Sequence, residues 1–434
     1  YSDEVFLTDD NPRFENPKKI RNDIKKGIKG RKIIEIPNRG KAILESIKNL
    51  NTGEILLVAG KGHEKSQDLG NQKIYFSDKK IILAAIKKKN LALSINLKLN
   101  IIKEVSGYKD LSSNLSLKLA KINSKEVKKD DIFFAIKGKK NDGNKFVSQS
   151  LKKRASLAIV NKIQKKLNSK RQIKVKNTLK FLSDVSKIFR NNINTKIISI
   201  TGSCGKTTLK ELLGNSLKKI SKVSISPKSY NNKYGVPLSL FNLKQFDDFG
   251  ILEVGMDKKG EIDYLSKIIQ PDVSVITNIN YAHAKNFKNI KQIALAKAEI
   301  IRNTKSNGFV VLNADDNFFK LHQKIANRNK LKVISFGLKK QISNIKLVNI
   351  KKERLNYRIK VKVKNLKKDF LISNNFESNI YNVLATLAIM SIYINISKID
   401  KHIFLNFKTP GGRGDFSKIK IGKKNINLID ESYN

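Results

Sequence analysis

The stretch from residue 196 to 208, KIISITGSCGKTT, constrains the fold of this chain more than any other segment. Residues 196–200 are rich in isoleucine and predict a buried strand, 201–206 predict a loop, and apolar residues at helical spacing follow. In such a unit the backbone N–H groups of the loop and the positive end of the helix point at one place, where phosphate oxygens bind well. We therefore expect a strand–loop–helix unit that binds a nucleotide.

The residue types in this loop suit a nucleoside triphosphate. Gly202 and Gly205 let the backbone approach the phosphates closely. Lys206 is expected to reach the β- and γ-phosphates, and Thr207 to place its hydroxyl on Mg²⁺. The predicted ATP contacts in the loop are Thr201, Gly202, Ser203, Cys204, Gly205, Lys206, Thr207 and Thr208.

Ile200, at the end of the predicted strand, departs from a typical phosphate-binding loop, and Cys204 lies in the loop. The first glycine of the general G-x-x-x-x-G-K-[ST] pattern is Ile200 here. A glycine turn that binds nothing is the alternative, but the strand, the Gly-Lys-Thr run and the helix coincide. Cys204 is expected to be a passive loop residue and not a nucleophile.

Acidic and imidazole side chains after other strands are candidates to hold the metal. Glu253 ends an apolar run, ILEVG, at the edge where open α/β sheets bind ligands. Because a buried carboxylate needs a partner, Glu253 is either linked to Mg²⁺ or part of a structural ion pair. His283 follows a strand predicted at Val273–Thr277, although a lone His is usually a plain surface or core residue. Lys297 and Glu299 lie on a predicted helix, where a solvated face is the alternative.

The composition excludes several classes of protein. The formal net charge is +51, but the lysines are spread through every segment with abundant Ile and Asn, as an AT-rich coding sequence produces. We expect no nucleic-acid partner, since aromatic residues are 7% with no Trp and stacking platforms would be sparse. No apolar run approaches the roughly 20 residues that span a bilayer. With one cysteine and no signal-peptide pattern, a cytoplasmic protein without membrane insertion is expected.

The first part of the chain reads as two small α/β units. Apolar runs at Glu4–Leu7 and Gly53–Ala59 predict strands, and Lys41–Leu50 predicts a helix between them. Asp131–Ile136 and Ala155–Val160 predict strands of the second unit. The predicted domains are 1–92 and 104–190, joined by a linker at 93–103.

The second part alternates strands and helices over residues 191–405, which favours a mostly parallel sheet with helices on both faces. We predict an α/β domain at 191–408 and a glycine-rich hinge, PGGRGDF, into a final unit at 409–434. Since the chain stops soon after, we expect a fragment of a longer product. A monomer is expected, although the sequence leaves the oligomeric state open.

Several motifs occur in the order and spacing typical of the central domain of Mur ligases, and the chain resembles that family. They are TGSCGKTT, NNKYGVP, EVG, TNINYAH and AKAE. The resemblance implies a modular α/β architecture, with a central ATPase domain flanked by smaller domains. It implies Mg²⁺ near Thr207, Glu253 and His283, and a carbamylated Lys297 as a ligand for a second Mg²⁺. The catalytic residues implied are Lys206, Glu253, His283 and Lys297.

The resemblance also implies nucleotide contacts outside the loop. Asn379 and Asn382 in SNIYNVLATLA match the family's adenine-binding helix, although Ser378 replaces a frequent His. Arg413 matches a hinge arginine near the phosphates, and Asp430 matches an aspartate that binds the ribose. Each of these residues taken alone could be a cap or turn residue.

Within the family, residues of about 104–434 resemble the MurF branch. The segment SKEVKKDDIFFAIKGKKNDGNKF matches the N-terminal domain that binds the UDP end of the substrate, with Lys125 where relatives have Arg. The resemblance implies that D-alanyl-D-alanine is added to UDP-MurNAc-tripeptide through an acyl phosphate, with ATP and Mg²⁺. Contacts on the UDP-peptide side are expected at Ser124, Asn231 and Asn232.

Residues 1–92 instead resemble the C-terminal domain of MurE, the diaminopimelate-adding ligase, through TDDNPR and AGKGHE. The resemblance implies contacts with meso-diaminopimelate from Asn11 and Arg13 and, at the amino-acid end, from Gly60 and Glu64. Arg provides a bidentate fork for a carboxylate and Glu accepts an ammonium. An ordinary Asn-Pro turn is the alternative. The domain order implies a MurE–MurF fusion that is incomplete at both ends.

Three other functions stay open. Folylpolyglutamate synthases share the loop but lack a UDP-binding first domain. A nucleic-acid-dependent ATPase would account for the charge. The chain as given could also be a non-catalytic fragment.

Overall fold

The computed structural model describes residues 2–51, 53–108, 111–112, 115–138, 141–281, 286–339, 343–353, 356–373, 379–412, 415–422, 424–430 and 432. The chain divides into two compact units, Tyr1–Asn96 and Leu97–Asn434. Within the described residues no helix is both long and apolar enough to cross a bilayer.

The first unit is a small α/β unit. Two parallel strands, β1 (Glu4–Leu7) and β2 (Lys32–Glu35), are accompanied by α1 (Pro17–Gly27) and α2 (Arg39–Asn49). A short antiparallel pair follows, formed by β3 (Ser66–Asp68) and β4 (Lys73–Tyr75). The core is small and is centred on Ile43, Ile47 and Ala85. The predicted strand 4–7 and helix 41–50 are confirmed.

The strand predicted at Gly53–Ala59 is wrong, since these residues form no ladder with another strand. Alternation in the sequence is still visible, because Leu56 and Val58 pack on the core while Ile55 and Leu57 are exposed. Alternating burial needs only an extended backbone, whereas a strand also needs a hydrogen-bonded neighbour. The apolar pattern therefore predicted the conformation of the segment and not its pairing.

The long helix α3 (Asp78–Ser106) contains the residues expected to form a linker, 93–103. The boundary between the two units, after Asn96, also falls within this helix. Lys, Leu, Ile and Asn dominate the stretch, and it contains no Gly or Pro to end a helix. The residues predicted to form a linker are therefore helical.

The second unit begins with a four-stranded parallel sheet in the order β5-β6-β7-β8. Its strands are β5 (Ala120–Lys121), β6 (Ile132–Phe134), β7 (Leu157–Val160) and β8 (Gln172–Lys174). The helices are α4 (Val147–Lys152) and α5 (Thr178–Asn191). Asn242 joins this sheet to the next one, because its side-chain amide exchanges two hydrogen bonds with the backbone of Ala120.

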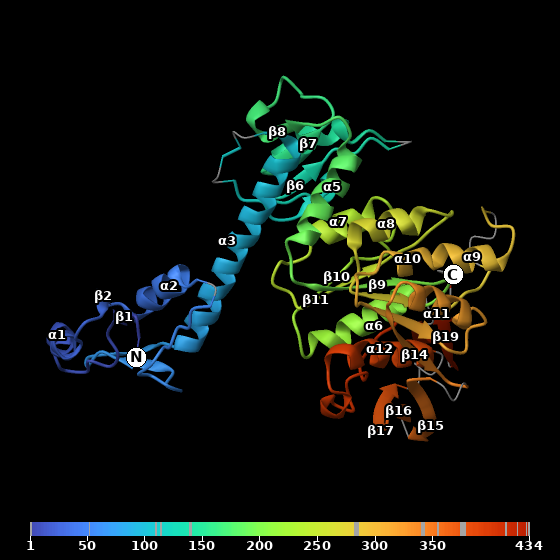
Figure 1. The fold of residues 1–434 in the computed structure, drawn as a ribbon. Coiled ribbons are helices and arrows are strands. Elements are labelled where there is room, and N and C mark those ends of the chain that lie inside the picture. Colours follow the sequence, from blue (N-terminus) through green and yellow to red (C-terminus); the bar gives the residue numbers. More distant parts are fainter. Residues whose placement is uncertain are drawn as a thin grey trace. The chain divides into compact units, whose positions relative to one another are not determined.

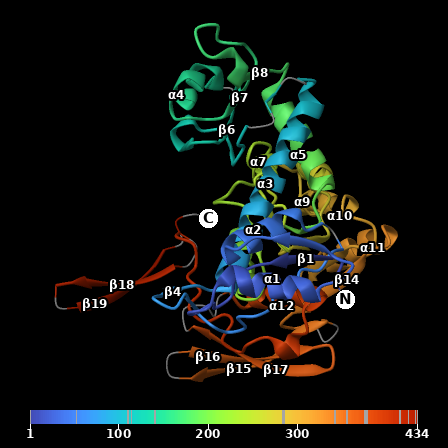
Figure 2. The ribbon, with the colours of Figure 1, turned by 90° about the vertical axis from the view of Figure 1, so that its left-hand side faces the viewer.

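The second unit also contains a nine-stranded sheet, in the order β10-β11-β9-β12-β13-β14-β15-β16-β17. The first seven strands in this order are parallel, and β15, β16 and β17 pair antiparallel side by side (Figure 2). The strands are β9 (Lys196–Thr201), β10 (Val223–Ile225), β11 (Phe249–Glu253), β12 (Val273–Ile276), β13 (Phe309–Asn313), β14 (Lys332–Gly337), β15 (Ile345–Glu353), β16 (Asn356–Val363) and β17 (Leu366–Ser373).

Helices cover both faces of this sheet, as Figure 1 shows for α6 and α12 on one side and α7 and α8 on the other. The helices are α6 (Lys206–Lys218), α7 (Gly235–Phe241), α8 (Glu261–Ile269), α9 (Ile290–Lys297), α10 (Glu299–Arg302), α11 (Phe319–Arg328) and α12 (Ile380–Tyr393). The expected α/β class, with a mostly parallel sheet between two helical layers, is confirmed. A hairpin of β18 (Asp415–Ile421) and β19 (Lys424–Asp430) ends the chain.

Candidate active site

The loop predicted to bind phosphate lies at the carboxyl end of β9, and α6 begins directly after it at Lys206. Gly202 has a positive φ of 146°, and a Cβ there would lie 1.9 Å from Thr277 Oγ1. Gly205, at the N-cap of α6, has a φ of +80°. With glycine at the N-cap, the loop supplies no capping side chain for the first N–H groups of α6. Such groups are suited to bind an anion.

Residues at the end of the neighbouring strand β12 hold the loop in shape. Thr277 Oγ1 donates to the Cys204 carbonyl at 2.6 Å, and the Cys204 N–H donates to Asn278 Oδ1 at 3.0 Å. Ser203 donates through its N–H to the Asn278 carbonyl at 3.0 Å and through its hydroxyl to the Asn280 carbonyl at 3.0 Å. Cys204 thus acts through its backbone, while its thiol is free and exposed.

Two lysines converge on one carbonyl of the loop. Lys206 Nζ donates to Gly202 O at 2.9 Å and to Ser203 O at 3.2 Å. Lys297 Nζ, at the end of α9, donates to the same Gly202 O at 2.9 Å. Lys297 is 1% exposed, and burial, together with the nearby Lys206 charge, lowers the pKa of its amine to about 7. The amine of Lys297 is therefore partly neutral near pH 7, and nucleophilic.

Thr207, Glu253 and Asn231 form a second cluster beside the loop. Thr207 Oγ1 donates to Glu253 Oε2 at 2.6 Å, and Asn231 Nδ2 donates to Glu253 Oε1 at 2.8 Å. Glu253 is 2% exposed and ends β11. A hydroxyl and a carboxylate oxygen are the hard donors that Mg²⁺ prefers, so this pair fits that ion. Among the described residues, no group of three or more His, Cys, Asp or Glu side chains is placed to hold a metal.

A cavity of about 330 Å³ adjoins the loop on the side of α12. Asn382 lines it and lies against the loop, since a Cβ on Gly205 would lie 3.1 Å from Asn382 Oδ1; its amide donates to Asn379 Oδ1 at 2.9 Å. Tyr381 OH donates to Asp315 Oδ2 at 3.2 Å, and burial raises the pKa of Tyr381 to about 12. The cavity is lined by Thr277, Asn278, Ile279, Asn280, Asn313, Asp315, Asp316, Asn317, Phe336, Tyr381, Asn382 and Ala385.

Sequence reasoning named neither Asp315 nor Tyr381 individually, although the family resemblance places the stretch 310–316, VVLNADD, near the nucleotide. Asp315 lies in the VVLNADD turn after β13, and Tyr381 lies between the two asparagines on the chain. The position of Asp315 after a parallel strand could have singled it out within that stretch. Tyr381 gave no comparable signal, because an aromatic residue on an apolar helix usually belongs to the core.

Some of the predicted site residues lie outside the described residues or show no contact with the loop. His283 and Arg413 lie outside the described residues, as does Ser378. Asp430 ends β19 and accepts a hydrogen bond from the Ser432 N–H at 2.9 Å. In the described part of the chain the structure gives no contact between Asp430 and the loop.

The side chains expected on the UDP-peptide side form hydrogen bonds with other residues of the chain. Ser124 is buried, and its hydroxyl donates to Gln149 Oε1 at 2.6 Å. Asn232 Oδ1 accepts from the N–H groups of Tyr234 and Gly235, both at 3.0 Å, at the start of α7. Of these three residues, only Asn231 is hydrogen-bonded to the Thr207–Glu253 pair beside the loop.

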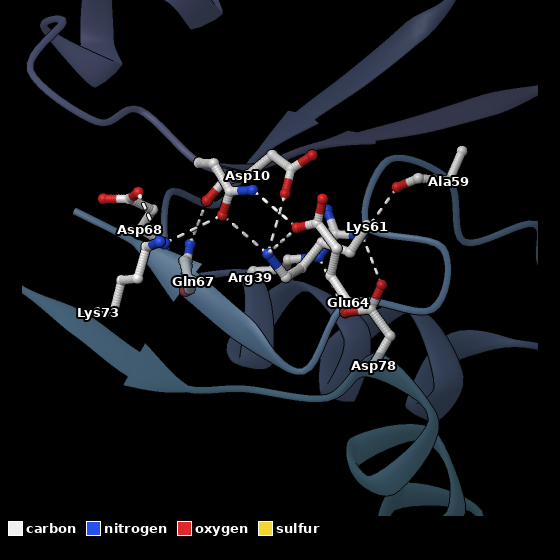
Figure 3. A network of polar contacts seen from close by, with 10 residues as sticks. Asp10, Arg39, Ala59, Lys61, Glu64, Gln67, Asp68, Lys73 and Asp78 are labelled. Carbon is white, nitrogen blue, oxygen red and sulfur yellow. Dashed lines mark hydrogen bonds and ion pairs between the residues drawn. The ribbon is translucent and has the colours of Figure 1, made fainter. Parts of the chain in front are cut away.

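In the first unit, the TDDNPR and AGKGHE segments lie side by side, and Figure 3 shows the polar network between them. Asn11 Nδ2 donates to Glu64 Oε2 at 2.8 Å, and the buried Lys61 donates to Asn11 Oδ1 at 2.8 Å. Gly60 has a φ of +110°, and a Cβ there would lie 2.9 Å from an Asp10 carboxylate oxygen. Arg13 is exposed on the same turn, with a φ of +51°.

Two family models match the chain, one described as the Mur ligase middle domain over residues 200–390 and one as the Mur ligase, glutamate ligase domain over residues 1–62. A UDP-N-acetylmuramoyl-tripeptide–D-alanyl-D-alanine ligase of Rickettsia prowazekii is 32% identical over 331 residues, which cover 75% of this chain and 71% of that protein. The chain belongs to the Mur ligase family. The same ligase of Buchnera aphidicola from Acyrthosiphon pisum is 36% identical over 53% of this chain and 50% of its own length.

Solved Mur ligases have the same fold. MurF from Acinetobacter baumannii superposes with a TM-score of 0.67 at 26% identity, over 77% of this chain and 72% of that one. MurF from Thermotoga maritima in complex with ADP superposes with a TM-score of 0.63 at 28% identity, over 74% and 73%. The chain thus spans from about half to about seven tenths of the Mur ligases it matches.

Proposed function

We propose that residues 104–434 are the UDP-substrate and ATP-binding parts of a MurF-type ligase, which adds D-alanyl-D-alanine to UDP-MurNAc-tripeptide. The observation that supports this most is the meeting of Lys206, Lys297, Thr207 and Glu253 around one glycine loop. The names of the relatives supply the substrates. We place the reaction in the cytoplasm, where ATP and UDP-linked sugars are available, and expect a monomer.

The reaction would proceed in two steps. A carboxylate oxygen of the tripeptide attacks the γ-phosphorus of ATP, the bond to the β-phosphate oxygen breaks, and an acyl phosphate and ADP result. The amine of D-alanyl-D-alanine, after losing a proton, then attacks the carbonyl carbon, and inorganic phosphate leaves as the amide forms. No protein nucleophile takes part.

The residues of the chain orient and stabilise these groups. The N–H groups at the start of α6 and the Lys206 ammonium would bind the phosphates and offset charge that develops on the transferred phosphoryl group. Thr207 and Glu253 would hold Mg²⁺, with His283 expected to join them, and bound Mg²⁺ would supply charge neutralisation at the phosphate oxygens. Asn379 and Asn382, with Arg413 and Asp430, are proposed for the adenosine end.

Substitution of Lys206 tests the nucleotide site. Lys206→Ala is expected to lower ATP affinity and phosphate release by about 100-fold or more, because one preorganised charge is lost. Phosphate release with UDP-MurNAc-tripeptide, D-alanyl-D-alanine and MgATP is the measurement. Lys218→Ala, an exposed position on the same helix, is the control.

The same assay separates the alternatives. Turnover with folate and glutamate in place of the UDP-peptide would indicate a folylpolyglutamate synthase. Stimulation of ATP turnover by DNA or RNA would indicate a nucleic-acid-dependent ATPase. Tight MgATP binding without amide formation would indicate a non-catalytic fragment, and near-normal turnover of Lys206→Ala would refute the role of Lys206.

A further inference from the structure

Lys210 is a charged residue inside the second unit that the proposed reaction does not use. It lies on α6, one helical turn beyond Lys206 and Thr207, and it is 0% exposed. Burial of an ammonium is costly unless hydrogen-bond acceptors surround it. The surroundings of Lys210 should therefore explain why a lysine occupies this position.

The ammonium of Lys210 binds the segment that follows β10. Its Nζ donates to the Ser226 carbonyl at 2.8 Å and also to the Lys228 carbonyl, and it forms an ion pair with Glu211 at 3.3 Å. Lys228 has a positive φ of 49°, so the chain turns sharply at this point. The lysine thus anchors a tight turn to the phosphate end of α6.

This turn leads directly into Asn231, which orients Glu253. Asn231 Nδ2 donates to Glu253 Oε1, and the Asn231 carbonyl accepts from the Gly255 N–H at 2.7 Å. A Cβ on Gly255 would lie 2.9 Å from Asn231 Cγ, so glycine there permits the close approach. The other Glu253 oxygen accepts from Thr207, as described above.

We infer that Lys210 is a positioning residue for the metal side of the nucleotide site. It fixes the turn at 226–230, the turn fixes Asn231, and Asn231 fixes one oxygen of Glu253 beside Thr207. The inference rests on the proposed function, because it assigns Glu253 and Thr207 to Mg²⁺. It predicts that loss of Lys210 affects binding of the metal far more than binding of the nucleotide alone.

The test is titration of the full chain with a fluorescent ATP analogue, with EDTA and with saturating Mg²⁺. In Lys210→Met the gain in affinity that Mg²⁺ produces should fall by about 10- to 100-fold, as for other residues that orient metal ligands. The affinity in EDTA should stay close to that of the wild type. Asn231→Ala should have the same effect, and the double variant should lose little more, because both act on Glu253.

Lys218→Met, with its exposed side chain on α6, is the control for a lost lysine. If thermal unfolding shows that Lys210→Met is not folded, Lys210→Gln, which keeps a donor of shorter reach, replaces it with the same expected result. An equal loss of affinity with and without Mg²⁺, or no loss, would overturn the inference. Wild-type binding that does not respond to Mg²⁺ would instead refute the proposed function, and the inference with it.

Discussion

At the scale of single residues, the environment of Lys297 is unusual for a lysine. Its side chain is buried, and its amine shares the Gly202 carbonyl with Lys206. Both burial and the neighbouring positive charge disfavour protonation, and the pKa falls to about 7. A neutral amine can attack the carbon of CO₂ and release a proton, which forms the carbamate that the family resemblance implies. We propose this modification for Lys297.

Carbamylation of Lys297 predicts a signal in ¹³C NMR. Protein equilibrated with ¹³CO₂ should give one strong carbamate resonance, which grows from pH 6 to pH 8 as the neutral fraction of the amine rises. Lys297→Arg should lack this resonance and lose activity by about 10- to 100-fold. Lys291→Arg, at an exposed position on α9, should keep both. A resonance that survives in Lys297→Arg would contradict the assignment.

At the scale of elements, the part of α3 that belongs to the second unit carries a buried lysine, Lys98. Lys98 donates to the Lys118 carbonyl at 2.8 Å, and its ammonium lies 5.4 Å from the ring centroid of Phe241 and 5.9 Å from that of Phe189. Burial lowers the pKa of Lys98 to about 8. The aromatic rings on α5 and α7 thus enclose a charge that water would solvate better.

This lysine predicts a pH dependence of stability. Below pH 8 the amine of Lys98 is protonated in both the folded and the unfolded protein. From pH 8 to about 10.5 it keeps its proton only in the unfolded protein. The free energy of unfolding therefore rises with pH in this window. Between pH 7 and 9.5 the free energy of unfolding of Lys98→Met should rise by about 2 kcal/mol less than that of the wild type. Urea unfolding measures this, and Lys187→Met, exposed on α5, should behave as the wild type does.

At the scale of the whole molecule, the two units match two different domain models of the Mur ligase family. The proposed nucleotide site lies within the second unit. The Asn11–Glu64–Lys61 network lies within the first and includes two of the residues predicted to contact diaminopimelate, Asn11 and Glu64. We propose that the first unit binds the amino-acid substrate of a MurE-type ligase, separately from the nucleotide.

Separate sites predict separate losses of binding. Arg13→Ala should weaken binding of meso-diaminopimelate at least about tenfold, because a carboxylate loses a bidentate partner. ATP binding should be unchanged. Calorimetric titration with diaminopimelate, lysine and ATP measures all three, and Lys18→Ala, an exposed position on α1, is the control. Equal binding of lysine and diaminopimelate, or loss of ATP binding, would argue against this proposal.

Local features of the site could be predicted from the sequence. The loop from Thr201 to Thr208 is contiguous, and its glycines, lysine and threonine act through groups a few residues apart. The strands around it are short apolar runs, so β9, β11 and β12 were predicted close to their observed bounds. Periodicity and turn chemistry are properties of neighbouring residues, and they need no knowledge of the fold.

Tertiary structure decided the rest. The amino acids alone determined that a glycine loop would lie between a buried strand and a helix, and that an alternating chain of this kind would form a parallel sheet. They did not determine that Lys210 would secure the turn before Asn231, that Tyr381 would join Asp315, or that residues 53–59 would lack a strand partner. Those outcomes depend on contacts between residues far apart in the chain, and only the packing of parallel strands brings such residues to one edge of a sheet.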